Sequence, residues 1–268
     1  MSQLSEGAVK DIVHRIGSRI VSGELKESSI LPREAELASE YGVGRSTLRE
    51  AVKVLSGKGL IRTVRRFGTQ VCSSDEWNFL DPDVLGWYAA VPANVPALIF
   101  SIIELRSAIE PAAAALAARR ASPREAADIL RHAEALLAVL PSAPFEFDVA
   151  FHLGILNATH NVLFRGLGAS YEVLLRAQFE AAWPRLWGEA RYHPDDKHVA
   201  LARAIMARDA AGASRVARDM MRTMRHNTGV MAEKMGVPAH PDRPGPRAST
   251  LFAGGAGAKP TPATGRRP

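Results

Sequence analysis

The N-terminal part of the chain places its apolar residues at helical spacing. In residues 7–21 this spacing predicts an amphipathic helix, with an apolar side made of Val9, Ile12, Val13, Ile16 and Ile20. A shorter helix is predicted after Pro32, because the first turn of a helix tolerates proline and because Leu37 and Ala38 then share one face. The pattern therefore predicts two helices before residue 42.

A tight turn and a strongly amphipathic helix follow. Gly42 and Gly44 supply the turn. In the next helix the apolar residues stand at i, i+3, i+4 and i+7, and they are Leu48, Ala51, Val52 and Leu55. Gly59 is suited to cap this helix in the left-handed conformation.

Two short strands complete this N-terminal module. Residues 60–64 and 69–72 predict a hairpin whose loop reads Arg65-Arg66-Phe67-Gly68. Two helices, a turn and a hairpin with a basic tip make a winged helix-turn-helix. We therefore expect residues 1–72 to form a DNA-binding domain of that type.

The polar face of the second helix of the module carries residue types that contact DNA. It presents side chains suited to phosphates and base edges, namely Arg45, Ser46, Thr47, Arg49 and Lys53. The alternative is that these charges form only the solvated face of a small helical domain. The turn, the basic helix and the arginines of the hairpin together favour DNA binding.

The rest of the chain is predicted to be helical. The helices are expected at 97–120, 123–139, 144–159, 161–182 and 195–235, the last with a break near Gly212. Short breaks between them favour antiparallel neighbours and hence a helical bundle over residues 97–236. The predicted fold is mainly α, a winged helix-turn-helix followed by an all-α bundle.

Two segments are expected to lie outside these domains. Residues 73–96 are predicted to be a linker, because their prolines and aspartates break regular structure, while Trp77, Phe79 and Trp87 could pin it to a neighbour. Residues 237–268 contain seven prolines and five glycines and almost no large apolar side chain. This composition predicts a disordered basic tail.

Charge is unevenly distributed along the chain. Residues 1–72 hold 12 basic and 8 acidic residues, residues 73–236 hold 17 and 19, and the tail holds 5 and 1. A basic N-terminal domain on a mildly acidic body is typical of a nucleic-acid reader joined to a domain of another kind. The single Cys72 excludes an intrachain disulfide framework. With no long uncharged apolar run and no signal peptide, we expect a soluble cytoplasmic protein with no membrane partner.

The chain resembles the GntR family of bacterial transcription regulators. In the N-terminal domain the matching residues are Leu31, Pro32, Glu34, Leu37, Ala38, Gly42, Val43, Arg45, Thr47, Arg49, Glu50, Ala51, Leu55, Gly59, Leu60, Ile61, Gly68 and Thr69. The body resembles the ligand-binding (FCD) domain of the FadR subfamily at Glu104, Leu105, Arg106, Glu110, Pro111, Asp148, His152 and His198. The segment 77–87 is similar to the linker of galactonate-operon repressors, a group within this family.

The resemblance implies which residues contact an operator. The recognition helix would contribute Arg45, Ser46, Thr47, Arg49 and Lys53, and the wing would contribute Arg65, Arg66 and Gly68. This chain departs from the family pattern at two places. It has Ala35 where an arginine is common, with Arg33 two residues earlier, and it has Phe67 in the wing where a small or basic residue is usual. Arg33 is therefore included among the expected DNA contacts.

Three residues of the body are candidates for a metal site. Asp148 and His152 stand four apart in a helical segment, so both lie on one face and can hold one divalent ion. In metal-binding members of the subfamily a later histidine, here His198, joins the pair. Another histidine follows 22 residues later in that pattern, where this chain has Met220, a poor ligand for a hard ion.

Two interpretations of this group remain open. Asp148, His152 and His198, with waters and a carboxylate of a small-molecule ligand, could complete the site of a divalent metal such as zinc. Alternatively, these residues are polar core residues that bond one another.

Two arginines are candidates for binding the carboxylate of a ligand. Arg106 and Arg176 each interrupt an apolar helical stretch, and a guanidinium can grip a carboxylate with two parallel hydrogen bonds. The alternative for each is an internal salt bridge, for Arg106 most simply with Glu110 one turn on. The expected ligand-binding residues are Arg106, Asp148, His152, Arg176 and His198.

The interpretation that follows is a homodimeric, metabolite-responsive repressor. We expect it to bind a double-stranded operator and a small carboxylate from sugar-acid catabolism, for instance an aldonate such as galactonate, or from organic-acid catabolism. No nucleophile with a neighbouring base and no phosphate loop is found, so no catalytic residue is expected. The alternative is a helical metal-dependent enzyme, or a metal-binding body, with an accessory DNA-binding domain.

Overall fold

The three N-terminal helices pack together through the apolar stripes that the sequence predicts. The computed structural model describes residues 3–138, 144–182 and 197–234. The helices are α1 (Gln3–Val21), α2 (Glu34–Tyr41) and α3 (Arg45–Gly57). Ile12 and Ile16 of α1, Leu37 of α2, and Leu48 and Leu55 of α3 are all buried in one core. Gly42, in the left-handed conformation at φ 66°, ends α2 as the turn requires.

The predicted hairpin is present. Strands β1 (Ile61–Val64) and β2 (Gly68–Val71) pair antiparallel, with Ile61 opposite Val71. Gly59, just after α3, has a φ of 77°, and a Cβ there would lie 2.3 Å from the carbonyl oxygen of Glu76. Only glycine fits this approach. Helices α1–α3 with β1 and β2 form the winged helix-turn-helix, which is called the head below.

Residues 73–96 contain helices, so the expectation that their prolines and aspartates break regular structure is wrong. The segment contains short 3-10 helices at Ser74–Glu76 and Pro92–Asn94 and the helix α4 (Pro82–Ala89). Asp81 caps α4 by accepting hydrogen bonds from the backbone N–H groups of Asp83 and Val84. Pro82 then occupies the first turn, where its missing N–H costs nothing. The aspartate and proline interpreted as breakers are therefore a helix start.

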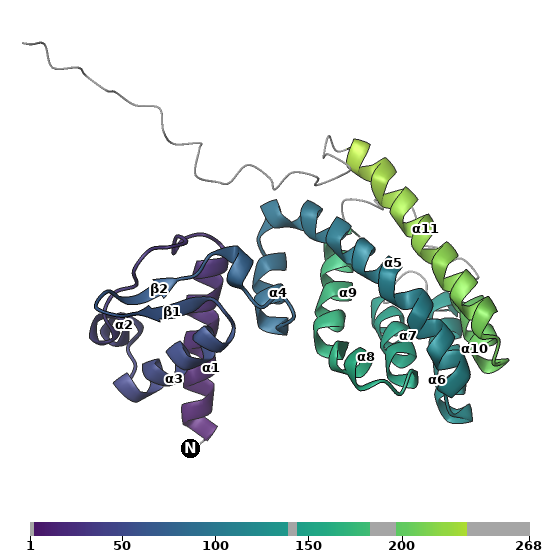
Figure 1. Ribbon diagram of the computed structural model, residues 1–268, viewed down its shortest axis with the longest axis horizontal. Helices are drawn as coiled ribbons and strands as arrows, with labels where there is room; N and C mark the ends of the chain where they lie inside the picture. Colours follow the sequence, from purple (N-terminus) through teal and green to yellow (C-terminus); the bar gives the residue numbers. More distant parts are fainter. Residues whose placement is uncertain (1–2, 139–143, 183–196, 235–268) are drawn as a thin grey trace, which may run out of the picture.

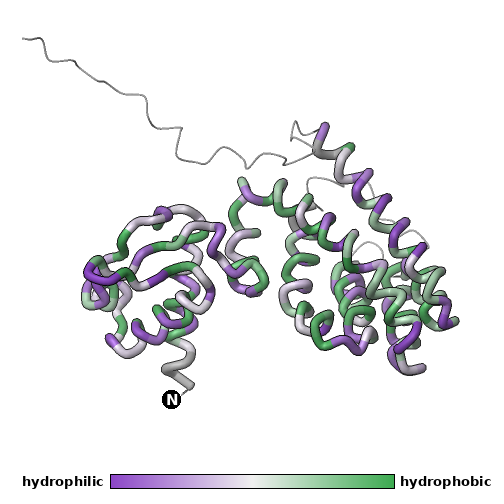
Figure 2. Tube along the Cα trace, viewed as in Figure 1, coloured by the Kyte–Doolittle hydropathy of each residue, from purple (hydrophilic) through white to green (hydrophobic). Residues whose placement is uncertain are grey.

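The body is an all-helical bundle, as predicted, built on the long helix α5. Its helices are α5 (Val95–Arg120), α6 (Pro123–Ala138), α7 (Pro144–Ala158), α8 (Val162–Gly166), α9 (Gly168–Ala182), α10 (Lys197–Met206) and α11 (Ala210–Lys234). Helix α5 packs against α7, α9, α10 and α11. Figure 2 shows hydrophilic residues along α11, whose opposite face buries Ala213, Ala217 and Met220 in the core.

Two helix boundaries in the body differ from the prediction. The helix expected at 161–182 is interrupted at Leu167, between α8 and α9. The break expected near Gly212 instead lies at residues 207–209. Arg208 adopts a φ of 61°, and the Asp209 carboxylate accepts a hydrogen bond from the N–H of Gly212. The Asp209 carboxylate therefore caps α11 at its start, and Gly212 lies inside the helix and not at the break.

Helix α4 lies between the head and the body (Figure 1) and belongs to the cores of both. Val84 and Trp87 pack in the head core, whereas Leu85 packs in the body core. No single helix among the described residues is long and apolar enough to cross a membrane; α4 and the Pro92–Arg120 segment together reach that length but are bent by 96°. The tail predicted to be disordered lies outside the described residues.

Candidate functional site

The recognition helix α3 buries one face and exposes the other. Leu48, Ala51 and Leu55 are inaccessible to solvent. On the opposite face Arg45, Ser46, Arg49 and Lys53 are exposed, and Thr47 is half-buried. Glycine precedes α3 and its first turn contains no acidic residue, so the N-terminal backbone N–H groups remain suited to a phosphate.

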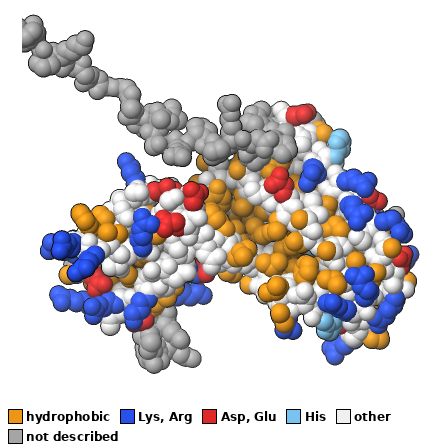
Figure 3. Space-filling model, viewed as in Figure 1, with side chains coloured by type: hydrophobic (Ala, Val, Ile, Leu, Met, Phe, Trp, Pro, Cys, Tyr) orange, Lys and Arg blue, Asp and Glu red, His pale blue; other side chains and the backbone are white. Residues whose placement is uncertain are grey.

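The exposed basic side chains of the head are only loosely held. The Arg49 Nε lies 3.2 Å from the Glu34 carboxylate, and the Lys53 Nζ lies 2.8 Å from the Glu50 carboxylate, both at the surface. Arg33 is exposed at the start of α2. Figure 3 shows Lys and Arg side chains at the end of the head that points away from the body. Surface ion pairs of this kind are weak, so these side chains are free to turn toward DNA.

The wing presents its tip to solvent. Arg65, Arg66, Phe67 and Gly68 are all exposed, and Phe67 keeps 70% of its surface accessible. The tip holds two residues with positive φ, Arg66 at 71° and Gly68 at 100°. The polar face of α3 and the wing tip are thus both exposed on the head, with the unusual Phe67 at the wing tip.

A second group of polar side chains converges inside the body. Asp148 and His152 come from α7 and His198 comes from α10, and their nearest ligand atoms all lie within 4.8 Å of one another. The Asp148 Oδ1 is 3.3 Å from the His198 Nε2 and 3.6 Å from the His152 Nε2.

A buried ion pair lies directly beside this group. Arg106 of α5 donates from Nε to the Glu110 Oε1 at 2.6 Å, and the two side chains are 2% and 7% exposed. The Tyr171 hydroxyl of α9 donates to the same Glu110 oxygen. Burial penalises the charge on Glu110, but Arg106 outweighs this penalty and lowers the pKa of the Glu110 carboxyl. Burial and the adjacent carboxylate raise the pKa of Tyr171, so the phenol remains protonated.

Arg106 also binds the histidine of the first group. Its Nη2 lies 2.9 Å from the His152 Nε2, and its Nη1 donates to the Gln178 Oε1 at 2.9 Å. A guanidinium has only donors, so the His152 Nε2 accepts and the ring proton sits on Nδ1, which lies 3.4 Å from the Glu110 Oε1. Arg106 is therefore salt-bridged to Glu110, as its alternative interpretation expected, and it also contacts His152. The group formed by Asp148, His152 and His198 is called the Asp148 cluster below.

Asp148, His152 and His198 together suit a divalent ion, on the condition that Arg106 releases the His152 Nε2. A carboxylate and two imidazoles are ordinary ligands for zinc and similar ions. Nδ1 of His198 is buried and has no hydrogen-bond partner among the described residues, so that ring is held from one side only. The lone pair on the His152 Nε2 is already used by Arg106. An ion bound to that nitrogen and the Arg106 contact exclude each other.

The structure does not bring Arg176 into this group. Its side chain is 45% exposed, pairs with Glu172 at 3.0 Å, and lies 4.7 Å above the ring of Phe145. Met220, the residue in place of a further histidine, is buried in the body core. One turn later, the Met224 sulfur accepts from the Gln178 amide that also contacts Arg106.

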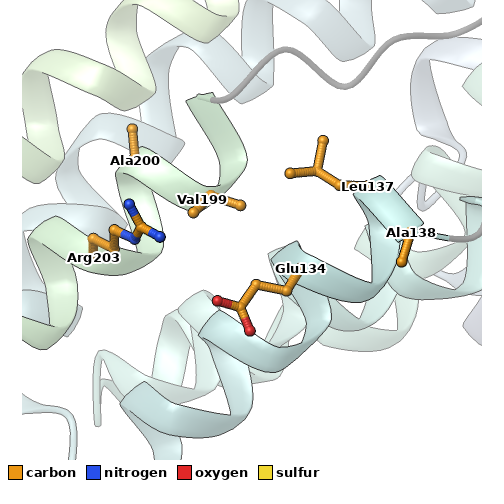
Figure 4. A pocket seen from close by; sticks show the side chains of 6 residues that line it. All are labelled: Glu134, Leu137, Ala138, Val199, Ala200 and Arg203. Carbon is orange, nitrogen blue, oxygen red and sulfur yellow. The ribbon is translucent and has the colours of Figure 1, made fainter.

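A pocket lies elsewhere on the body. It has a volume of about 610 Å³ between α6 and α10 and is lined by Glu134, Leu137, Ala138, Val199, Ala200 and Arg203. Figure 4 shows the Glu134 and Arg203 side chains on opposite sides of it. It contains none of the residues of the Asp148 cluster, although Val199 follows His198 in sequence.

Tyr171 was not among the predicted site residues, and no local sequence signal marks it. It is 61 residues from Glu110, and only the packing of α9 against α5 brings the two together. Glu110 did have a signal, because it stands one helical turn after Arg106.

Comparison with known proteins finds separate matches for the head and for the body. Residues 8–71 match the gntR family of bacterial regulatory proteins, and residues 101–223 match the FCD domain. The chain is 34% identical over 214 residues to the galactonate operon transcriptional repressor of Escherichia coli, covering 78% of this chain and 92% of that protein. It is 30% identical to the putative L-lactate dehydrogenase operon regulatory protein of Escherichia coli, covering 76% of this chain and 79% of the relative.

A solved structure shares the fold. The structure of Lar, described as controlling the agr system of Listeria monocytogenes, superposes with a TM-score of 0.50 at 17% identity, covering 85% of this chain and 97% of that one. The relatives named above are transcription regulators, which does not support the enzyme alternative. The chain is a metabolite-responsive DNA-binding transcription regulator that belongs to the gntR family of bacterial regulatory proteins, with a C-terminal FCD domain.

Proposed function

We propose that the protein is a repressor of sugar-acid or organic-acid catabolism whose body senses a small carboxylate at Arg106. The observation that carries this proposal is the buried Arg106 beside the Asp148 cluster, a cation that a carboxylate can grip with two hydrogen bonds. A relative with 34% identity is named as a galactonate operon repressor, which favours an aldonate among the carboxylates. Gln178 and Tyr171 would offer hydrogen-bond donors and acceptors to the hydroxyl groups of a sugar acid bound beside Arg106.

The proposal includes a divalent metal held by Asp148, His152 and His198. Such an ion would supply a second positive charge to the ligand carboxylate. Arg106 now donates to the nitrogen of His152 that an ion needs. A carboxylate that draws the guanidinium away frees that nitrogen, so the sugar acid and the ion should strengthen each other's binding.

The proposed site on DNA is a palindromic operator read by a homodimer in the cytoplasm. Two heads related by a two-fold axis match two half-sites. The recognition helix would contribute Arg45, Ser46, Thr47, Arg49 and Lys53, with Arg33 beside them, and the wing would contribute Arg65, Arg66 and Gly68. Val162 and Leu163 of α8 are 68% and 76% exposed, and such exposed apolar side chains are suited to a contact between the two copies of the dimer. Light scattering on the protein as it elutes from a size-exclusion column measures the oligomeric state.

A thermal-shift screen tests the ligand class. Galactonate and other sugar acids, each added with Zn²⁺, should raise the melting temperature of the full chain. At a hundredfold excess over Kd, binding adds about 2.7 kcal/mol, which corresponds to roughly 5 °C or more. The same screen with EDTA should give a smaller shift. A panel in which no sugar acid or organic acid shifts the wild-type protein would contradict the proposed ligand class.

A further inference from the structure

Helix α4 is attached to the head by two contacts made by one tryptophan. The Trp87 Nε1 donates to the His14 Nδ1 of α1 at 2.7 Å. The Trp87 ring lies so close to α1 that a Cβ on Gly17 would be 2.3 Å from it. Since Trp87 and Val84 also pack in the head core, α4 and α1 are expected to move together.

Lys58 ties the end of the recognition helix to the start of α4. It directly follows α3, and its Nζ donates to Asp81 at 2.7 Å and to Asp83 at 2.8 Å. Its side chain is only 11% exposed. Burial penalises its charge, but the two carboxylates outweigh this and raise the pKa of Lys58. The Lys58 carbonyl also accepts from the Asn78 N–H at 2.9 Å, so the backbone is tied as well.

Ser170 ties the same segment to the body. Its buried hydroxyl on α9 donates to the carbonyl oxygen of Leu80, the residue that precedes the α4 cap Asp81. The next residue along α9 is Tyr171, whose hydroxyl donates to Glu110. Glu110 in turn holds Arg106. A continuous series of contacts therefore runs from the buried arginine through α9 and residues 80–83 to the end of α3.

From these contacts we infer that Ser170 and Lys58 are positioning residues that couple ligand binding in the body to the placement of the recognition helix. The inference rests on the proposed function in one respect, that a carboxylate ligand binds Arg106 and moves its guanidinium, which also alters the Arg106 bond to Glu110. Glu110 and Tyr171 then change their bonding, and the start of α9 carries this change through Ser170 to the segment 80–83. Because Lys58 joins that segment to α3, ligand-bound and ligand-free proteins hold the recognition helix differently. A ligand shifts DNA binding only through such a difference between states.

The first test removes the body-side contact. Ser170→Ala should leave operator affinity without ligand within about twofold of wild type, because no DNA-facing residue changes. The factor by which galactonate with Zn²⁺ weakens operator binding should fall at least about fivefold, the lower end of ordinary coupling. The matched control is Ser107→Ala, whose hydroxyl donates only within its own helix to Ile103. Wild-type coupling in Ser170→Ala would overturn the inference.

The second test removes the head-side contact. Lys58→Met keeps the aliphatic stem and deletes the charge that binds Asp81 and Asp83. It should reduce the galactonate effect on operator binding to the same extent as Ser170→Ala, with galactonate affinity within about twofold of wild type. Lys197→Met, on the body surface beside Thr223, is the control and should keep full coupling. Lys58→Met with unchanged coupling would count against the inference.

The third test needs no ligand, and so separates this inference from the proposed function. Tyr171→Phe removes the hydroxyl that binds Glu110 deep in the body. In the ligand-free full chain, amide hydrogen exchange should accelerate several-fold in residues 78–89 and in the last turn of α3, but not in α6. Changes confined to α5 and α9 would overturn the coupling route. If galactonate fails to bind wild type while this exchange pattern is observed, only the proposed ligand is wrong.

Discussion

Glu110→Ala should lower the free energy of unfolding of the body by about 3–5 kcal/mol, the usual loss when one partner of a buried ion pair is removed. The variant leaves the Arg106 charge almost fully buried without its carboxylate, and it also removes the acceptor of the Tyr171 hydroxyl. Denaturant unfolding followed by far-ultraviolet circular dichroism measures the loss, because most of the described body is helical.

The matched control for Glu110→Ala is Glu172→Ala. Glu172 pairs with Arg176 at the same i,i+4 spacing, but both side chains are more than 40% exposed. An exposed pair contributes at most about 1 kcal/mol, so this variant should unfold almost as wild type does. Equal losses of unfolding free energy in the two variants would contradict a larger contribution of the buried Arg106–Glu110 pair to the stability of the body.

Arg45→Ala and Arg49→Ala should each weaken operator binding by about 1–3 kcal/mol if the side chain contacts a base. Both arginines are exposed on the face of α3 opposite its buried stripe, so neither variant disturbs the head core. Fluorescence anisotropy at several salt concentrations separates two kinds of contact. Loss of a base contact relaxes sequence preference, whereas loss of a phosphate contact reduces the salt slope by about one.

The control for the recognition helix is an arginine on the body. Arg131 of α6 is 68% exposed and pairs with Asp128, so Arg131→Ala should bind the operator as wild type does. If Arg45→Ala and Arg49→Ala both bind the operator with wild-type affinity and salt dependence, α3 is not the recognition helix.

The sequence was sufficient for the head because its signals are local. The stripe of Leu48, Ala51 and Leu55 predicts α3 and its buried face, and the structure confirms both. The linker shows the limit of such signals. Asp81 and Pro82 are found both in breaks and at helix starts, and only the residues that follow decide which applies. From the sequence a break was expected at these residues, whereas the structure shows a helix that joins the two cores.

The site in the body was only partly predictable. Helical periodicity places Asp148 and His152 on one face, whereas His198 came from the family resemblance, and the structure brings the three together. The partners Tyr171 and Gln178 reach Arg106 or Glu110 only through the packing of α9 on α5, over 61 and 72 residues of sequence. No periodicity carries information across such distances. The same limit applies to Arg176, whose apolar surroundings in sequence do not prevent its exposure in the fold.

The most direct test of the account is the affinity of the full chain for its operator with and without a sugar acid. Selection from random double-stranded DNA should enrich a palindromic site, and galactonate with Zn²⁺ should weaken binding to that site by about tenfold or more, within the usual range of coupling. The His198→Ala variant should bind the same site equally well without responding to galactonate. Failure to enrich any site, or operator binding that no sugar acid or organic acid alters, would contradict a repressor that senses a carboxylate in its body.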